Sequence, residues 1–401
     1  MSETRYDWLA DRWVIFAPHR SQRPDEFKDA LLSPSALVTC PFCAGCEDQT
    51  PATLLRLPRQ SAGSKRNRPW QVRVVANKYP ALTPLADLPQ AIHVVAVGGA
   101  AQKNEIHGVE FHNDLEYRVS SNLSDQEHEP DRAYEPEHGN EIVSDFLSST
   151  SEDSQSYDEP LFARRSILGA HEVIIETPEH LHSLTQLSES HTQLVFEAFR
   201  RRLVHWRAHD SLHYAVIFKN VGSDAGASLT HSHSQLIATN FVPPDVTRSC
   251  RRLLLYRETY GVTYFSDVLT KELAAGNRIV LESQNFVVLT PFASQIPYFI
   301  WILPKKKEAR FEEVSDEDLK ELAIVTRRVL QAMETLFPQA AYNFVLHTSP
   351  FDPCWDEVFQ WRMEIFPRLT KVAGFEWGSD CFINPVLPEV AASELSKHLH
   401  G

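Results

Sequence analysis

The chain has 401 residues, of which 39 are Lys or Arg and 53 are Asp or Glu, so its formal net charge is −14. Since a domain averages about 100–200 residues, this length predicts two domains or one large duplicated unit. The acidic balance argues against a general nucleic-acid coat but not against an anionic small-molecule substrate. No run reaches the roughly 18 apolar residues of a membrane helix, and the first residues lack the apolar stretch of a signal peptide. We therefore expect a cytoplasmic protein without membrane or nucleic-acid partners.

The N-terminal region predicts two strands and two polar turns. The first strand spans 13–17, and the turn that follows contains Arg20 and Arg23. The second strand, rich in β-branched residues, spans 72–76 and ends at a turn that contains Asn77.

Between these strands lies a Cys-x-x-Cys pair, Cys40 and Cys43. In a reducing compartment this spacing is typical of half a metal site, which needs two further ligands from elsewhere. The alternative is a redox pair, but a thioredoxin-type motif opens a helix, whereas this pair lies between proline-rich loops. Cys46 is near but its spacing is less regular, and we interpret it as a bystander.

An acidic segment interrupts the chain after the second strand. Residues 121–160 contain twelve acidic residues and one basic residue, a net of −11, so the other 361 residues have a net charge of only −3. A Ser/Glu/Asp-rich composition with few large apolar residues predicts a flexible surface loop, at about 114–162. The alternative is an acidic segment that binds a partner.

The pattern of the remaining chain predicts two copies of one order of elements: strand, helix, strand, loop, strand. The first copy has a helix at 187–206 with an apolar stripe of helical period, and the second has a helix that begins near Ser315 and ends before Pro338. The predicted strands are 171–176, 214–218, 232–238, 285–289, 298–303, 342–346 and 361–366. The repeat indicates a duplication. The alternative is two unrelated α+β domains.

The strand at 232–238 carries the most informative pattern, His231-Ser-His233-Ser-Gln235. Alternate residues of a strand share one face, so two imidazoles and an amide should lie side by side. Alternating histidines can bind a metal or attack phosphorus to form a phosphoramidate. The loop before them, 220–228, is rich in Gly and Ala, so its backbone amides could approach a phosphate closely.

These residues resemble the galactose-1-phosphate uridylyltransferase branch of the histidine-triad superfamily. The motifs occur in the family's order: Trp13-Val-Ile-Phe-Ala-Pro-His-Arg-Ser-Gln-Arg-Pro24, Cys40-Pro-Phe-Cys43, Val75-Ala-Asn-Lys-Tyr-Pro-Ala-Leu82, Glu176-Thr-Pro-Glu-His180, Phe218-Lys-Asn220, His231-Ser-His-Ser-Gln235 and Gly374-Phe-Glu376. Each motif alone is weak, but the combination is specific and covers most of the chain outside the acidic segment. The resemblance implies an α+β fold of two duplicated histidine-triad-like halves, 1–240 and 241–401, each an antiparallel sheet with packing helices.

The resemblance also implies a ping-pong nucleotidyl transfer. His233 would attack the α-phosphorus of a nucleotide sugar, a sugar 1-phosphate would leave, and a phosphorylated acceptor would then take the nucleotide from the histidine. Histidine-triad hydrolases have a third histidine where this chain has Gln235. Because an amide can hold a phosphate oxygen but cannot act as a base, Gln235 favours a longer-lived nucleotidyl enzyme.

The family pattern supplies the ligands that the cysteine pair lacks. It makes His231 and His180 zinc ligands together with Cys40 and Cys43. A Cys2His2 set with no open position is a structural zinc site. His182 is the alternative to His180.

Further residues match family positions that bind the substrate. Positions that contact the phosphates are matched by Asn220 and Ser228. Positions near the phosphate or nucleotide are matched by Arg20, Arg23 and Asn77. Without that role the two arginines would be solvated surface residues, and Asn77 would be an ordinary turn residue.

The sequence departs from the uridylyltransferase pattern at two places. Ser232 stands between the histidines where the sugar-uridylyl enzymes usually have proline, and His-Ser-His-Ser-Gln resembles the ADP-glucose phosphorylase branch, which transfers adenylyl from ADP-glucose to inorganic phosphate. The family's additional metal site uses a histidine pair in the C-terminal half, but the matching strand has Arg362 and Glu364 and no histidine. We therefore expect one zinc ion, and the contacts to the acceptor sugar are in doubt.

Three functions follow, in this order. The first is a transferase that moves a nucleoside monophosphate from a nucleotide sugar of the UDP-glucose class to a hexose 1-phosphate. The second is an ADP-glucose phosphorylase, and the third is a zinc-stabilised nucleotide-binding protein without turnover. The partners expected are a nucleotide sugar with a sugar 1-phosphate or phosphate. The family is commonly dimeric, which implies a homodimer.

Overall fold

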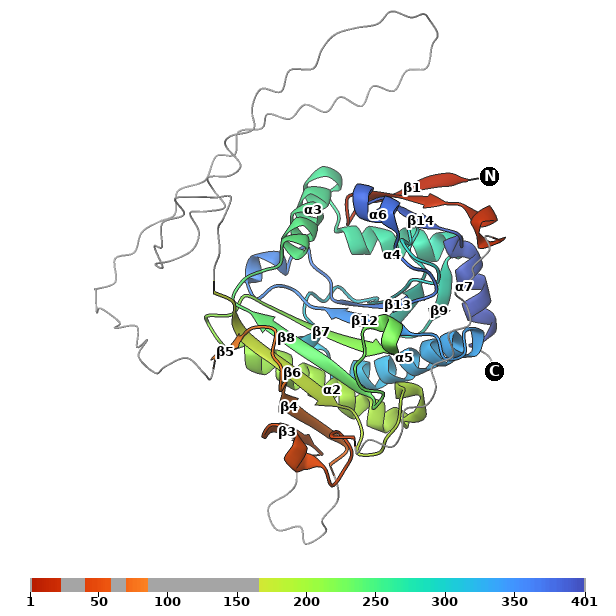
Figure 1. The fold of residues 1–401 in the computed structure, drawn as a ribbon. Coiled ribbons are helices and arrows are strands. Elements are labelled where there is room, and N and C mark those ends of the chain that lie inside the picture. Colours follow the sequence, from red (N-terminus) through yellow and green to blue (C-terminus); the bar gives the residue numbers. More distant parts are fainter. Residues whose placement is uncertain (1, 23–39, 59–69, 86–165, 400–401) are drawn as a thin grey trace, which may run out of the picture. The chain divides into compact units, whose positions relative to one another are not determined.

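The computed structural model describes residues 2–22, 40–58, 70–85 and 166–399 (Figure 1). The predicted acidic loop at about 114–162 and Arg23 lie outside the described residues. All described residues belong to one structural unit, Met1–Leu88 with Ser166–Gly401. In these described ranges, no helix combines the length and the apolar character needed to cross a bilayer.

One long antiparallel sheet runs through both predicted halves. Its strands in the first half are β3 (Thr53–Leu57), β4 (Val72–Ala76), β6 (Leu168–Ile175), β7 (Tyr214–Val221) and β8 (His233–Thr239). Those in the second half are β9 (Ile279–Glu282), β10 (Phe286–Leu289), β11 (Ile300–Pro304), β12 (Tyr342–His347) and β13 (Arg362–Pro367). The short β5 (Thr83–Pro84) pairs in parallel with β6, and every other neighbouring pair is antiparallel.

The strand order confirms the predicted duplication. From the outer edge to the centre, the first half reads β3-β4-β6-β8-β7 and the second reads β9-β10-β11-β13-β12. In the described residues, and apart from the short β5, each half therefore contributes three strands, a long helix and two more strands, with the last two strands exchanged in the sheet. The halves meet where β7 pairs with β12, so their sheets form a single surface. The chain division at residue 240 stays a prediction.

Two long helices cover one face of this sheet (Figure 1). They are α2 (Glu189–Arg207) and α5 (Asp316–Leu336), close to the bounds that the apolar period predicts. Each begins after a serine, Ser188 or Ser315, whose hydroxyl accepts a hydrogen bond from a backbone N–H of the first turn. Their apolar stripes join the inward side chains of both halves in one core.

Over the second half, helices also cover the opposite face. There α3 (Pro244–Tyr260) and α4 (Tyr264–Ala275) pack through Leu253 and Phe265 on strand residues such as Trp301. The sequence pattern did not predict α3, because only Cys250 and Leu253 of that helix are buried and its apolar stripe is thin. A small sheet of β1 (Glu3–Asp7), β2 (Arg12–Phe16) and β14 (Phe382–Asn384) completes the fold, together with α6 (Gly374–Ser379) and α7 (Pro388–Lys397).

The second half has an ion-pair cluster where the family's additional metal site was considered. The Arg362 Nε donates to a Glu364 oxygen at 2.6 Å, and the His347 Nε2 lies 3.2 Å from the other oxygen. Burial alone would raise the pKa of Glu364, but Arg362 and His347 outweigh burial and hold the pKa at about 2. At neutral pH this carboxylate is therefore already paired with an internal cation.

Candidate active site and metal centre

In the first half, the sheet face opposite α2 carries the alternate side chains of β8 together with Phe42, whose ring centroid lies 5.3 Å from that of His233. Leu236 and Ala238 point into the core beneath α2, so His233 and Gln235 lie on the opposite face. β8 pairs with β6 on one side and β7 on the other, which gives this strand a rigid central position. His233 and Gln235 therefore share a strand face as predicted, whereas His231, expected on the same face, lies before β8 begins.

His233 is held in one tautomer by its own strand. The residue is only 7% exposed, and its Nδ1 lies 2.7 Å from the backbone oxygen of His231. A carbonyl can only accept, so Nδ1 carries the proton and Nε2 keeps its lone pair. Burial, followed by the nearby Lys219 charge, lowers the pKa of His233, so the ring is neutral at pH 7. A neutral imidazole with a free Nε2 is the nucleophilic form.

A buried ion pair lies beneath the histidine strand. The Lys219 Nζ donates to Glu176 at 2.6 Å, to the Ser232 hydroxyl at 2.9 Å and to the backbone oxygen of His233 at 3.0 Å. The hydroxyls of Ser232 and Ser234 each donate to Glu176 at 2.5 Å. Burial alone would raise the pKa of Glu176, but Lys219 and the two hydroxyls outweigh burial and lower the pKa. These contacts tie the backbone of β8 to a fixed internal charge pair.

Sequence reasoning assigned no role to Glu176 or Lys219. Both are single charges at the ends of apolar strand segments, and both side chains have no exposed surface. A lone charge within a buried strand is costly unless a partner is present, so each was a signal that a partner existed. Nothing local identified the partner, since 43 residues separate the two.

Gln235 belongs to a second cluster, with His171 and Asn77. The backbone N–H of Ala81 donates to the His171 Nδ1 at 3.2 Å, which places the ring proton on Nε2. Nε2 lies 2.8 Å from the Gln235 Oε1 and 3.0 Å from the Asn77 Nδ2. Because His171 occupies the amide oxygen, the nitrogen of Gln235 remains the group that can donate to an anion. The structure thus brings the predicted Asn77 and Gln235 together and adds His171, which sequence reasoning missed.

The small-residue loop turns sharply after β7. Gly222 has φ +82°, and a Cβ there would lie 2.8 Å from the Ala341 Cβ, so only glycine fits. Three amides of the predicted phosphate cradle, those of Ala225, Gly226 and Ala227, donate to carbonyls within the loop. These three amides are therefore not free to donate to a phosphate, and the roles of Asn220 and Ser228 stay predictions.

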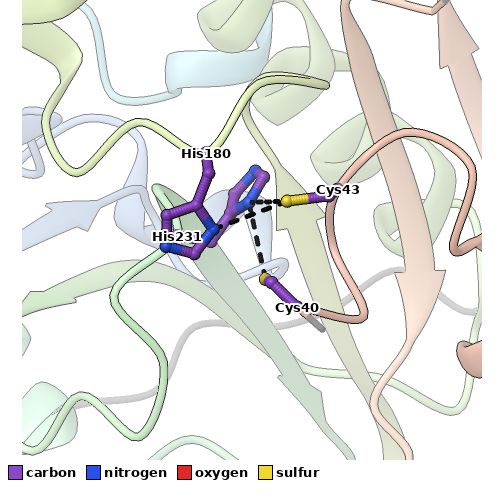
Figure 2. A group of neighbouring side chains, drawn as sticks. All are labelled: Cys40, Cys43, His180 and His231. Carbon is purple, nitrogen blue, oxygen red and sulfur yellow. Dashed lines mark hydrogen bonds between the residues drawn. The ribbon is translucent and has the colours of Figure 1, made fainter. Parts of the chain in front are cut away.

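The predicted metal ligands come together at one end of β8 (Figure 2). Ligand atoms of Cys40, Cys43, His180 and His231 all lie within 4.8 Å of one another. The His231 Nδ1 is 3.6 Å from both sulfur atoms, and the His180 Nδ1 is 3.5 Å from the Cys43 sulfur. A tetrahedral ion with Zn–S and Zn–N bonds of about 2.3 and 2.0 Å fits ligands at this spacing.

Hydrogen bonds orient both histidines toward the sulfur atoms. The His231 Nε2 donates to the backbone oxygen of Thr177 at 2.8 Å, which leaves Nδ1 without a proton on the side of the cysteines. The His180 Nε2 lies 3.1 Å from the Thr230 hydroxyl. His182 instead has its Nδ1 3.3 Å from the Thr230 carbonyl and is outside the ligand group, as is Cys46. The four residues could therefore hold a metal ion.

The Arg20 side chain is exposed in the turn after β2, a strand of the small sheet, and it forms no ion pair with any described residue. Arg23 lies outside the described residues. Their roles stay predictions.

Relatives cover the chain from end to end. An ADP-glucose phosphorylase of Arabidopsis thaliana is 30% identical over 396 residues, 97% of this chain and 91% of the relative. A galactose-1-phosphate uridylyltransferase of Haemophilus influenzae is 29% identical over 229 residues, 57% of this chain and 65% of the relative. The solved structure of an Arabidopsis thaliana ADP-glucose phosphorylase with bound ADP-glucose has a TM-score of 0.69 at 27% identity, over 99% of both chains.

The family models agree with these relatives and with the motifs. The model for the N-terminal domain of galactose-1-phosphate uridyl transferase matches residues 72–243, and the model for its C-terminal domain matches residues 250–376. Together they cover more than half of the chain and confirm the resemblance that the motifs indicated. The chain therefore belongs to the galactose-1-phosphate uridylyltransferase family of nucleotidyltransferases.

Proposed function

We propose that this protein transfers a nucleoside monophosphate from a nucleotide sugar to a phosphorylated acceptor through a nucleotidyl group on His233. The observation that carries the proposal is the unprotonated Nε2 of His233, fixed on the same strand face as the Gln235 amide. In the first step Nε2 attacks the α-phosphorus, a P–N bond forms, and the P–O bond to the sugar 1-phosphate breaks. In the second step an acceptor phosphate oxygen attacks, the P–N bond breaks, and His233 is regenerated.

The proposed contacts to the substrate are Gln235, Asn220, Ser228 and Asn77. The Gln235 nitrogen would donate to a non-bridging oxygen of the transferred phosphate, since His171 already occupies the amide oxygen. An amide has no proton-accepting nitrogen at pH 7, so Gln235 cannot activate water. This supports a nucleotidyl enzyme that waits for a phosphate acceptor instead of undergoing hydrolysis.

For the donor and acceptor, we place ADP-glucose and inorganic phosphate first. The relative that is similar over 97% of the chain is an ADP-glucose phosphorylase, and Ser232 has the hydroxyl that binds Glu176 and Lys219, which proline could not supply. This reverses the order that the sequence alone indicated. UDP-glucose with a hexose 1-phosphate remains the second candidate, supported by the family match and the uridylyltransferase relatives.

A donor panel separates the two candidates. We expect ADP-glucose with phosphate to release glucose 1-phosphate and ADP at least about 10-fold faster than UDP-glucose does, a difference of about 1.4 kcal/mol in transition-state binding. Product release is measured by chromatography with each donor, with phosphate or galactose 1-phosphate as acceptor. A preference for UDP-glucose with galactose 1-phosphate would support the second candidate. Donor binding without release of any sugar phosphate would contradict both and support a binding protein.

We also propose that the metal is one structural zinc ion. Two thiolates and two imidazoles are the donors that zinc prefers, and a set with no open position suits a structural role. Such an ion would join the loop at 40–43 to the first residue of the histidine motif. The ligands come from three segments that are distant in the sequence, the loop at 40–43, His180 and His231, so metal binding would contribute to stability.

Replacing one ligand should remove the metal and lower thermal stability. We expect about one zinc per purified chain, and we expect Cys43→Ser to lose zinc to a chelator and to melt roughly 5 °C lower or more. Metal content is measured by elemental analysis and melting by circular dichroism. Cys381→Ser, which changes a cysteine remote from the group, is the matched control. Equal zinc content in both variants would contradict the assignment.

A further inference from the structure

A contact between the two halves reaches the proposed phosphate site. Asn220 of β7 and Asn343 of β12 are directly opposite in the antiparallel pair that joins the halves. The Asn343 Nδ2 donates to the Asn220 Oδ1 at 2.8 Å and to the backbone oxygen of Ala225 at 2.8 Å. The Arg368 Nε, just beyond β13, donates to the Asn343 Oδ1 at 2.6 Å. Asn343 is only 8% exposed.

The arginine determines the direction of this chain of hydrogen bonds. Amide oxygen and nitrogen are hard to distinguish by shape alone, but a guanidinium can only donate. The atom of Asn343 that faces Arg368 is therefore its oxygen, and its nitrogen must face Asn220. That nitrogen donates, so the facing atom of Asn220 is its oxygen. The nitrogen of Asn220 is left on the other side of the amide, toward the loop residue Gly226.

This orientation of the Asn220 amide favours the binding of an anion. A phosphate oxygen is attracted by an N–H group and repelled by an oxygen lone pair. Two acceptors at the loop, the Asn220 Oδ1 and the Ala225 carbonyl, are both occupied by the same Asn343 amide. The second half therefore removes two acceptors from the site and leaves one donor.

We infer that Asn343 and Arg368 are positioning residues, which hold the Asn220 amide with its nitrogen available to the phosphates of the donor. The inference rests on the proposed function, because it takes Asn220 as a phosphate contact. It gives the second half, which has no nucleophile of its own on β13, a role in the reaction of the first half.

The near-isosteric change Asn343→Asp tests this orientation. An aspartate still pairs with Arg368 but presents an acceptor to Asn220, which must then turn its nitrogen toward residue 343 and its oxygen toward the phosphate. We expect kcat/KM for ADP-glucose to fall by about 30-fold or more, since one donor is lost and an acceptor faces the anion. Asn277→Asp, in an exposed turn, adds the same charge elsewhere and should change kcat/KM less than about 2-fold.

A double-mutant cycle separates orientation from charge. In an Asn220→Ala background, Asn343→Asp should have less than about 3-fold effect, because there is no amide left to turn. An equal effect in both backgrounds, or no effect in either, would overturn the inference. A wild-type protein that forms no nucleotidyl adduct would instead contradict the proposed function.

Substitutions at Arg368 test the same orientation without changing the buried Asn343. Arg368→Lys keeps a donor-only side chain and should retain kcat/KM within about 3-fold, whereas Arg368→Gln can present either atom and should lower it by about 10-fold. Circular dichroism checks that each variant is folded. Equal kcat/KM in the lysine and glutamine variants would contradict the directional role of the arginine.

Discussion

His233→Ala should abolish the nucleotidyl adduct and lower turnover by at least about 10⁴-fold, because the change removes the Nε2 lone pair that forms the bond to phosphorus. The backbone carbonyl of His231 fixes the His233 tautomer, so the reactive lone pair is prepared before substrate arrives. The variant should still bind the donor, since Asn77, Asn220 and Gln235 are unchanged.

The adduct is measured with donor labelled in the nucleotide, followed by mass spectrometry of the peptide that contains 231–235. A phosphoramidate is labile in acid and stable in base, which distinguishes it from an ester on a serine. His213→Ala, at an exposed histidine just before β7, is the matched control and should form the adduct normally. An adduct of the same mass on the His233→Ala protein would contradict the proposal that His233 is the nucleophile.

Lys219→Met should lower the free energy of unfolding by about 3–5 kcal/mol, because it leaves the Glu176 carboxylate buried without its cation. Both side chains of the pair are completely buried, and only the hydroxyls of Ser232 and Ser234 would remain as donors to Glu176. The backbone oxygen of His233 would lose a partner as well, so activity should fall with stability.

A denaturant titration measures this effect, and a double variant isolates the pair. Glu176→Met with Lys219→Met should lose less stability than the sum of the two single changes, because no buried charge is left unpaired. Lys307→Met, at an exposed position, should stay within about 0.5 kcal/mol of the wild type. Strict additivity of the two single changes would show that Glu176 and Lys219 do not interact.

The secondary structure was largely predictable because its signals are local. The apolar stripes of α2 and α5 and the serines before them follow from helical geometry, which repeats every 3.6 residues whatever lies outside the helix. The same applies to β8, where alternation alone placed His233 and Gln235 on one face. The helix α3 was not predicted, because its narrow apolar stripe gives only a weak local signal.

The residues that make up the site were harder to predict, because their partners are distant in the chain. Cys40 and His231 are 191 residues apart in the sequence. Only the resemblance to a family predicted that both bind one metal ion, because their spacing gives no such signal. His171 and the Glu176–Lys219 pair were missed because their roles arise from the registers of β6 with β8 and of β8 with β7. A one-residue shift in either register would turn those side chains to the other face.

The sequence by itself determined the periods of the elements, their caps, the alternating histidine motif and the cysteine pair, because each depends on neighbouring residues along one backbone segment. Only the tertiary structure decided that His180 and not His182 faces the thiols, and that Asn343 of the second half contacts Asn220 of the first. These outcomes depend on strand pairing between segments separated by tens to hundreds of residues. Such pairings reflect the burial and hydrogen bonding of the whole sheet, which no local pattern contains.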